Sequence, residues 1–328
     1  MSTDREIRLA MLGMIPGNGH PYSWSAIING YNPEAMAACP YPTIPKYLGQ
    51  QPLESVRIAG ARVTHIWTDN PDEAAAVAAA SKIETVVRNP EDVIGEVDAV
   101  VIATDDGNDH VRRAVPFVEA GLPLLVDKPL AINLDDLRQF IAWQSAAHPI
   151  LSSSGMRYAP EIKQVAERNA QLGDLRWVTS FTCKTWERYG IHALEAIYPV
   201  LGPGFTLVQT LPQSGSDVVH LTHRTGVQVT ITAIHDALGS FGAVHVYGTK
   251  GQLALTCLDT YAAFRGQLLA FVEMLKTGTP PFPFGQTVEL MAIIIAGIRS
   301  REEQRAVPLE EIYEQLNPRE RLVPAALS

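Results

Sequence analysis

The chain has 328 residues, a length that favours two domains over a single compact core. Its hydrophobic fraction of 46% and charged fraction of 19% are typical of a folded globular protein, and its net charge of -9 argues against nucleic acid as a partner. The longest apolar run, at 290–298, is too short to span a bilayer, and the N-terminus has no apolar signal core. We therefore expect a cytoplasmic protein without a membrane partner.

Short apolar and β-branched runs alternate with helical stretches over the first 150 residues. The expected strands are residues 7–12, 61–67, 84–87, 97–103 and 122–126. Continuous apolar strands are typical of a parallel sheet buried on both faces, and their alternation with helices implies right-handed βαβ units. Residues 1–150 are therefore predicted to form a Rossmann-type α/β domain.

Capping residues mark where the helices of this domain begin. Asn70 precedes Pro71 and an acidic first turn, and the stretch NPEDVIG from Asn89 repeats that start. Asn133 caps a helix expected to run to about Ala146. Residues 31–54 interrupt this rhythm, because they are rich in proline and tyrosine, and we expect an ordered excursion or lid there rather than a helix.

The first strand leads into a glycine-rich turn, GMIPGNGH. A dinucleotide site needs glycine where the backbone approaches a pyrophosphate, with a helix N-terminus facing the anion. The strict GxGxxG pattern is absent, since Ile15 and Asn18 stand at its second and third glycines, and a simple glycine-rich turn is an open alternative. The cofactor candidates here are Gly13, Ile15, Pro16, Gly17 and Asn18.

Polar residues follow the next two strands as well. Asp69, after the second strand, would bind the ribose hydroxyls of NAD and repel the extra phosphate of NADP, although it is equally placed to precede a helix cap. NAD is therefore favoured, with NADP left open. The carboxyl end of the strand at 97–103 adds the cofactor candidates Thr104, Asp105, Asp106 and His110, and helix capping is the alternative for its acids.

The segment LLVDKPLAI places Asp127, Lys128 and Pro129 at the end of the following strand. Parallel strands end at one edge of the sheet, so these residues are expected beside the same cofactor cleft. Asp127 either anchors the loop or contacts the cofactor.

The pattern changes in the second half of the chain. Five stretches between 174 and 251 alternate apolar and polar residues, which predicts an antiparallel sheet with one covered face, and helices follow at 264–278 and 287–304. Residues 151–328 are thus expected to form a second α/β domain around an open, largely antiparallel sheet. Its free face is predicted to bind another subunit, giving a homodimer or homotetramer.

The spacing from IATDDGNDH through LPLLVDKPLAINLDDL resembles the Gfo/Idh/MocA family, named after glucose-fructose oxidoreductase, inositol dehydrogenase and rhizopine catabolism. Its hallmark is Glu-Lys-Pro where this chain has Asp127-Lys128-Pro129. SSGMRYAPEI at 153–162, YGIHALEAIYPVLG at 189–202 and VHVYGTKGQL at 244–253 are similar to further motifs of the family. The resemblance implies an NAD(P)-dependent oxidoreductase with a nucleotide-binding domain and a domain for substrate binding and oligomerisation.

The resemblance also implies roles for single residues. Lys128 and His192 would act together at the nicotinamide, the histidine taking the hydroxyl proton and the ammonium stabilising the alkoxide. Many relatives carry Asp four residues before that histidine, where this chain has Arg188, and Glu195 is the nearby acid that remains. Arg157 is implied at the cofactor. The substrate candidates are Tyr158, Trp186, Arg188 and Tyr189, with simple packing as the alternative for the aromatic residues.

No metal or disulfide is expected. The three cysteines lie far apart in the chain, and His220 and His223 fall on opposite faces of one strand.

The expected reaction is hydride transfer between the cofactor and a hydroxyl carbon of a sugar, cyclitol or related polyol. Two alternatives remain at this point: a redox-neutral enzyme that holds NAD tightly and oxidises transiently, and a sensor that binds nucleotide and sugar without turnover.

Overall fold

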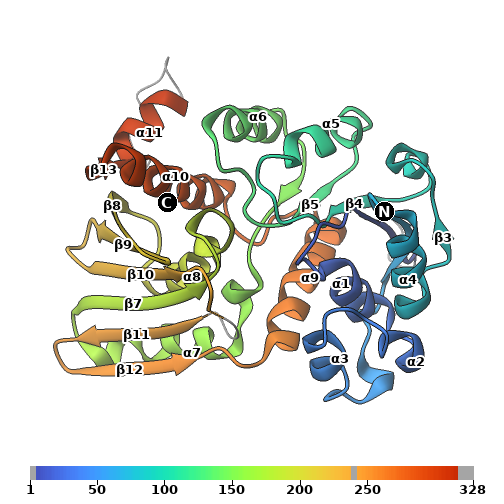
Figure 1. The fold of residues 1–328 in the computed structure, drawn as a ribbon, viewed down its shortest axis with the longest axis horizontal. Helices are drawn as coiled ribbons and strands as arrows, with labels where there is room; N and C mark the ends of the chain where they lie inside the picture. Colours follow the sequence, from blue (N-terminus) through green and yellow to red (C-terminus); the bar gives the residue numbers. More distant parts are fainter. Residues whose placement is uncertain (1–4, 238–241, 317–328) are drawn as a thin grey trace. The chain divides into compact units, whose positions relative to one another are not determined.

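A computed structural model describes residues 5–237 and 242–316, so the outermost ends of the two predicted domains lie outside the described residues (Figure 1). The chain forms two compact units. Unit 1 comprises residues 1–128, 142–153 and 260–284, and unit 2 comprises 129–141, 154–259 and 285–328. The division therefore does not follow one cut near residue 150, because a helix from late in the chain joins unit 1.

Unit 1 is built on a parallel six-stranded sheet with the strand order β3-β2-β1-β4-β5-β6. The strands are β1 (Ile7–Leu12), β2 (Ala61–Trp67), β3 (Thr85–Val86), β4 (Ala99–Ile102), β5 (Leu124–Val126) and β6 (Ile150–Leu151). Every side chain of β4 and β5 is buried, as expected for strands covered on both faces. The order reverses between β1 and β4, which makes their carboxyl ends the switch point where such sheets bind ligands.

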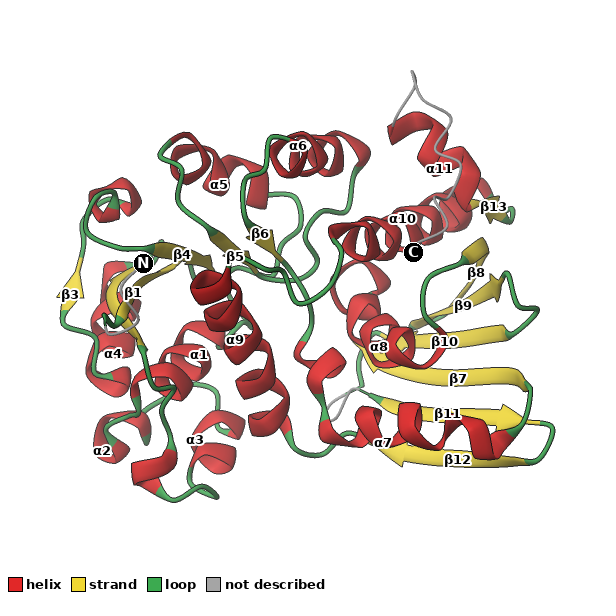
Figure 2. Cartoon of the chain, turned by 180° about the vertical axis from the view of Figure 1, so that it is seen from behind, coloured by secondary structure: helices red, strands yellow, loops and turns green. Residues whose placement is uncertain are grey.

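Helices cover both faces of this sheet (Figure 2). They are α1 (His20–Asn29), α4 (Pro71–Ser81), α5 (His110–Glu119) and α9 (Thr260–Thr277). The cap at Asn70 is confirmed, since its side chain accepts a hydrogen bond from the N–H of Asp72. The similar start at Asn89 forms a capping box, but only a 3-10 turn, η2 (Pro90–Val93), follows it, so the full helix expected there was wrong.

Residues 31–54 are ordered, as expected, but the prediction that they contain no helix was wrong. They form α2 (Pro33–Met36), α3 (Thr43–Leu48) and the 3-10 turn η1 (Leu53–Ser55). Met36, Ile44 and Leu48 are buried and bring both helices into the core of unit 1. The prolines begin or flank these short helices rather than excluding them, because proline is tolerated in a first helical turn.

Unit 2 contains a seven-stranded sheet with the order β12-β11-β7-β10-β9-β8-β13. The strands are β7 (Leu175–Cys183), β8 (Phe205–Gln213), β9 (Ser216–His223), β10 (Gln228–Ile234), β11 (Ala243–Gly248), β12 (Gly251–Thr256) and β13 (Val307–Pro308). The sheet is largely antiparallel, as predicted. One pair departs from that pattern, because β7 and β10 are parallel neighbours.

One face of the unit 2 sheet is covered and the other is open. The helices are α7 (Pro160–Arg168), α8 (Trp186–Leu201), α10 (Phe284–Glu303) and α11 (Leu309–Leu316), with the 3-10 turns η3 (Gly155–Tyr158) and η4 (Asn169–Leu172). Helix α8 packs on β7, β10 and β11, and buried side chains alternate with less buried ones along β9 and β10. Helix α6 (Leu134–Ser145) spans the boundary between the units and begins after Asn133, whose side chain caps it as predicted.

Among the residues that the structure describes, no helix is long and apolar enough to cross a membrane.

Candidate functional site

The turn after β1 contains two glycines with a positive φ, and neighbouring side chains pack against the first of them. Gly13 has a φ of 87°, and a Cβ there would lie 2.8 Å from the Thr104 methyl and 3.2 Å from Arg113 Nη1. Gly17 also has a positive φ, while Pro16 and Gly17 are exposed. These two positions have a conformation that only glycine adopts without strain, which accounts for both glycines although the sequence of the turn departs from the usual dinucleotide motif.

Asn18, at the place of the third glycine, has a structural task that the sequence did not reveal. Its buried side chain donates from Nδ2 to the Ala103 carbonyl, 3.0 Å away, and to Asp127 Oδ2, 3.1 Å away. Its Oδ1 accepts from the N–H of His20, the first residue of α1. The hydrogen bonds of this one amide therefore connect the residues that follow β1, β4 and β5.

Asp69 follows β2 and is joined to helix α5 by an arginine. Arg113 Nη2 lies 3.0 Å from Asp69 Oδ1, and the same guanidinium also binds Asp109. The two carboxylates outweigh the effect of burial and raise the pKa of Arg113, so the guanidinium stays charged. Because 44% of the Asp69 side chain is exposed, its carboxylate is accessible to a ligand.

A small hollow of about 90 Å³ lies beside this ion pair, in unit 1. The last residues of β1, β2 and β4 contribute to it, and its lining comprises Leu12, Trp67, Pro90, Glu91, Ile102, Arg112, Arg113, Pro116 and Phe117. The lining is largely apolar and also includes two arginines and one glutamate, so a flat aromatic group could pack against it.

The residues after β4 differ in their surroundings. Thr104 donates to Asp109, and its carbonyl is hydrogen-bonded to the buried His110 ring, 2.7 Å away. Asp106 is exposed and accepts from the N–H of Asn108, which is the turn-capping role. Asp105, by contrast, is 1% exposed and faces the end of the next strand.

At the end of β5 the structure encloses both charged residues of the segment LLVDKPLAI. Lys128 is 2% exposed, and its Nζ lies 3.4 Å from Asp105 Oδ2. Asp127 is fully buried, with Oδ1 accepting from the N–H of Lys128 at 2.7 Å. A buried ammonium and a buried carboxylate each lose their hydration, and the attraction between them only partly offsets that free-energy cost. A buried ion pair of this kind therefore indicates that the residues have a function. Pro129 is buried as well.

Unit 2 carries the histidine predicted on α8. His192 is 2% exposed, and its Nδ1 lies 2.7 Å from the Ser154 hydroxyl, which also caps η3. Glu195 does not pair with His192; it accepts from the N–H of Ser154 and binds Arg157. Burial raises the pKa of Glu195, and Arg157 opposes that shift. A serine, rather than the acid expected, therefore orients this imidazole.

Arg157 is held within unit 2 on three sides. Its guanidinium binds Glu195, donates to Gln286 Oε1 at 2.8 Å and lies 5.2 Å from the centre of the Tyr198 ring. Tyr158, its neighbour, is partly buried. The arginine is thus already part of a polar network.

Trp186 has to be corrected as a substrate candidate. Its side chain is completely buried, its indole N–H donates to the Ile294 carbonyl, and it fits against Gly297, where a Cβ would lie 2.3 Å from its Nε1. It is a packing residue, the alternative that the sequence left open for the aromatic residues.

Tyr189 remains a candidate beside the histidine. Its ring meets that of His192 edge to face at a centroid distance of 4.7 Å, and Lys184 Nζ donates to its hydroxyl at 2.8 Å. Lys184 has a φ of 60°, a conformation that is uncommon for a residue with a side chain and that often marks functional sites. Arg188 is partly exposed at the start of the same helix.

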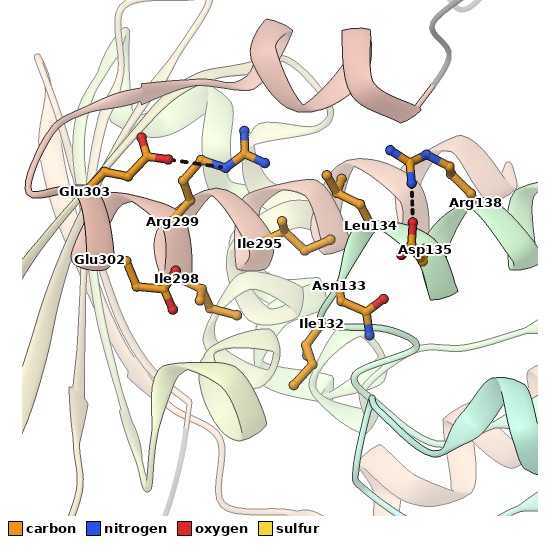
Figure 3. A pocket seen from close by; sticks show the side chains of 10 residues that line it. All are labelled: Ile132, Asn133, Leu134, Asp135, Arg138, Ile295, Ile298, Arg299, Glu302 and Glu303. Atoms are coloured by element: carbon orange, nitrogen blue, oxygen red, sulfur yellow. Dashed lines mark hydrogen bonds and ion pairs between the residues drawn. The ribbon is translucent and has the colours of Figure 1, made fainter.

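A larger hollow of about 460 Å³ lies in unit 2, between the start of α6 and α10 (Figure 3). Its lining contains two ion pairs, Arg138 with Asp135 and Arg299 with Glu303. None of the predicted site residues lines it, and we assign it no part in the site.

Among the described residues, no group of three or more His, Cys, Asp or Glu is arranged to hold a metal ion. Cys39, Cys183 and Cys257 are buried and form no disulfide with one another.

Sequence reasoning missed four residues that the structure brings to these positions: His20, Arg113, Ser154 and Lys184. His20 is the last residue of the turn GMIPGNGH and Ser154 lies within SSGMRYAPEI, so both motifs contained a usable signal. Arg113 lies in an ordinary helical sequence and Lys184 in an ordinary turn sequence, so nothing in the sequence indicated their positions in the structure.

The parallel sheet, its positive-φ glycine turn and the polar residues at the switch point define a dinucleotide-binding protein of the Rossmann class. Residues 45–153 match the family described as "Oxidoreductase family, NAD-binding Rossmann fold". This part of the chain thus matches the Gfo/Idh/MocA family, the family that its motifs predicted.

Known relatives agree with this assignment. Inositol 2-dehydrogenase 1 of Saccharopolyspora erythraea is 39% identical over 101 residues, which are 30% of this chain and 30% of that protein. The matched stretches thus span less than a third of the curated relatives' length. Two solved structures share the fold at low identity. Myo-inositol 2-dehydrogenase from Lactobacillus plantarum has a TM-score of 0.74 at 15% identity, covering 93% of this chain and 99% of that one. Scyllo-inositol dehydrogenase from Lactobacillus casei, solved with NAD(H) and scyllo-inositol, has 0.71 at 14%, with the same coverage.

Proposed function

We propose that this protein is an NAD-dependent oxidoreductase that moves a hydride between nicotinamide and a hydroxyl carbon of a cyclitol or related polyol. The observation that carries the proposal is the buried Lys128–Asp105 pair at the switch point of a nucleotide-binding sheet. The cyclitol class is suggested by the inositol dehydrogenases among the relatives.

The residues of unit 1 fit a dinucleotide. The exposed Gly17, with its positive φ, would let a pyrophosphate approach the backbone of the turn that leads into the N-terminus of α1. Asp69 would bind the ribose hydroxyls, and the hollow beside Arg113 would take the adenine. The bound NAD would supply the hydride acceptor.

Two residues would handle the proton and charge of the hydroxyl. Lys128, with its ammonium held by Asp105, would lower the energy of the developing alkoxide. His192 would accept the hydroxyl proton, with its ring oriented through Nδ1 by Ser154. Tyr189 would line the substrate beside this imidazole.

A panel of cyclitols, polyols and sugars, assayed for reduced nicotinamide with NAD and NADP separately, tests the proposal. We expect turnover of at least one cyclitol, and a loss of about 100-fold or more in kcat for Lys128→Ala and His192→Ala, as is usual when an acid or base is removed. Full turnover by both variants on a substrate found in the panel would refute the assigned roles.

A redox-neutral enzyme with tightly held NAD is the second candidate. The excursion at 31–54 favours it, because Tyr41 and Ile44 press on Gly19, where a Cβ would lie within 2.8 Å of both side chains. Helix α3 would thereby cover the cofactor turn and slow release. Denaturing the purified protein and assaying the supernatant for nucleotide tests this candidate, and a protein purified without nucleotide would count against it.

We also propose that a second copy of the chain covers the open face of the unit 2 sheet. Trp177 and Tyr247 are direct cross-strand neighbours on that face and are 40% and 37% exposed, and Leu211 is 48% exposed. Large apolar side chains exposed on a sheet face are expected where another protein surface covers that face. Light scattering should find a dimer or tetramer, and Trp177→Lys should reduce its mass. A wild-type monomer would contradict this.

A further inference from the structure

Unit 1 contains a carboxylate–imidazole pair that the proposed chemistry does not use. His20 Nδ1 lies 2.5 Å from Asp127 Oδ2, and the aspartate is completely buried. Asp127 also accepts from Asn18 and from the N–H of Lys128. Its oxygens are thus committed to three donors inside the protein, and Asp127 acts as an anchor rather than as a group that meets the cofactor.

The pair determines which nitrogen of His20 faces outward. A carboxylate accepts hydrogen bonds, so Nδ1 of the imidazole carries the proton that lies between them. In the neutral ring Nε2 is then an acceptor. Nε2 has no hydrogen-bond partner in the part of the chain that the structure describes, and 15% of the His20 side chain is exposed.

The ring is held rigidly in this orientation. Trp24 stacks on it at a centroid distance of 4.4 Å with 12° between the planes, and Phe264 meets it edge to face at 5.2 Å. With Asp127 at Nδ1, three neighbours fix the direction of Nε2. Because the imidazole is already ordered, little conformational entropy is lost when a ligand donates a hydrogen bond to Nε2.

The pair also lies at the place where this fold binds its ligand. His20 is the first residue of α1 after β1, Asp127 follows β5, and Asn18 connects both to the carbonyl of Ala103 after β4. The ends of β1 and β4 form the switch point of the sheet, and β5 is the strand next to β4. A carboxylate-backed imidazole is therefore beside the glycine-rich turn, whereas the Nδ1 of His192 is paired with a serine hydroxyl.

We propose that His20 Nε2 accepts a hydrogen bond from a ligand hydroxyl, either on the nicotinamide ribose or on the polyol substrate. This inference rests on the proposed function and adds a binding residue to the same site. The aromatic surroundings of His20 exclude water from most of the ring, which strengthens a hydrogen bond made at its open edge.

The test is His20→Asn compared with His20→Gln. The Asn amide nitrogen matches Nδ1 and keeps the bond to Asp127, but this variant has no atom at Nε2. The longer Gln side chain places an acceptor near Nε2 and gives up the bond to Asp127. We expect His20→Asn to unfold in urea near the wild-type midpoint and to lose about tenfold in ligand affinity or kcat/KM, and His20→Gln to recover part of that loss while being less stable.

Two measurements identify the hydroxyl. Fluorescence titration with NADH gives the cofactor Kd, and steady-state kinetics with the polyol found in the panel give KM and kcat. A weaker NADH Kd assigns the hydroxyl to the ribose, and a loss in kcat/KM with an unchanged NADH Kd assigns it to the substrate.

Wild-type NADH affinity and kcat/KM in His20→Asn would overturn the inference while leaving the proposed function intact, because Lys128→Ala tests the latter separately. A wild-type protein that binds no NADH would overturn both.

Discussion

Asp69→Asn should change the cofactor preference of the protein. The carboxylate stands where the ribose of the adenosine is expected, and 44% of its side chain is exposed, so water screens it. A 2′-phosphate carries a charge of about -1.5 to -2, and two unit charges 4 Å apart repel by about 1 kcal/mol in water. Removing the carboxylate should therefore favour NADPH by about 1.5–2 kcal/mol, roughly 10- to 30-fold in the ratio of NADPH to NADH affinities.

Arg113 increases the effect. In the wild type its Nη2 is paired with Asp69 at 3.0 Å, and in Asp69→Asn that nitrogen becomes available to the phosphate. Fluorescence titrations with NADH and NADPH at low ionic strength measure the ratio, because salt screens the repulsion. Asp72→Asn is the matched control, since it removes an exposed carboxylate from the first turn of α4 and should leave the ratio unchanged. Equal ratios in Asp69→Asn and Asp72→Asn would refute the placement of the ribose.

Three further predictions concern stability and reactivity. Burial lowers the pKa of His223 from its ordinary value of 6.5. Because the unfolded chain then binds the proton more readily than the folded protein, the free energy of unfolding should fall as the pH drops below about 6.5. If urea titrations of His223→Gln showed the same fall, this explanation would be contradicted. Gly297→Ala should lower the free energy of unfolding by about 1–3 kcal/mol, because the added Cβ meets Trp186. Gly285→Ala in the same helix is the control, since its Cβ has open space and should not lower that free energy. Equal urea midpoints for the two variants would count against the packing role of the tryptophan. Burial raises the pKa of the Cys257 thiol to about 12. Because the thiolate is the reactive form, a thiol-specific reagent should modify Cys257 far more slowly in the folded protein than in the urea-unfolded chain. Rapid modification of the native thiol would contradict that.

Local signals in the sequence predicted much of unit 1. The cap at Asn70 and the apolar strands depend on neighbours within a few residues, and the structure has them as expected. The position of Lys128 at the end of β5 followed from strand alternation alone.

Contacts between distant segments could not be predicted. His20 and Asp127 are 107 residues apart, and nothing in either segment shows that the imidazole lies against that carboxylate. The same holds for Ser154, which takes the place beside His192 that the sequence suggested for Glu195. The parallel pairing of β7 with β10 is likewise a choice of register and neighbour, which alternation of side chains along a strand does not encode.

Transfer of a hydrogen label tests the central claim most directly. The protein would be incubated with NAD and a cyclitol that carries deuterium on its hydroxyl carbons, and the nicotinamide then examined by mass spectrometry. The proposed function predicts deuterium on the nicotinamide ring, whether reduced cofactor is released or stays bound, and predicts its loss in Lys128→Ala. A cyclitol that is consumed while the nicotinamide remains unlabelled would contradict net oxidation of the cyclitol by NAD at this site.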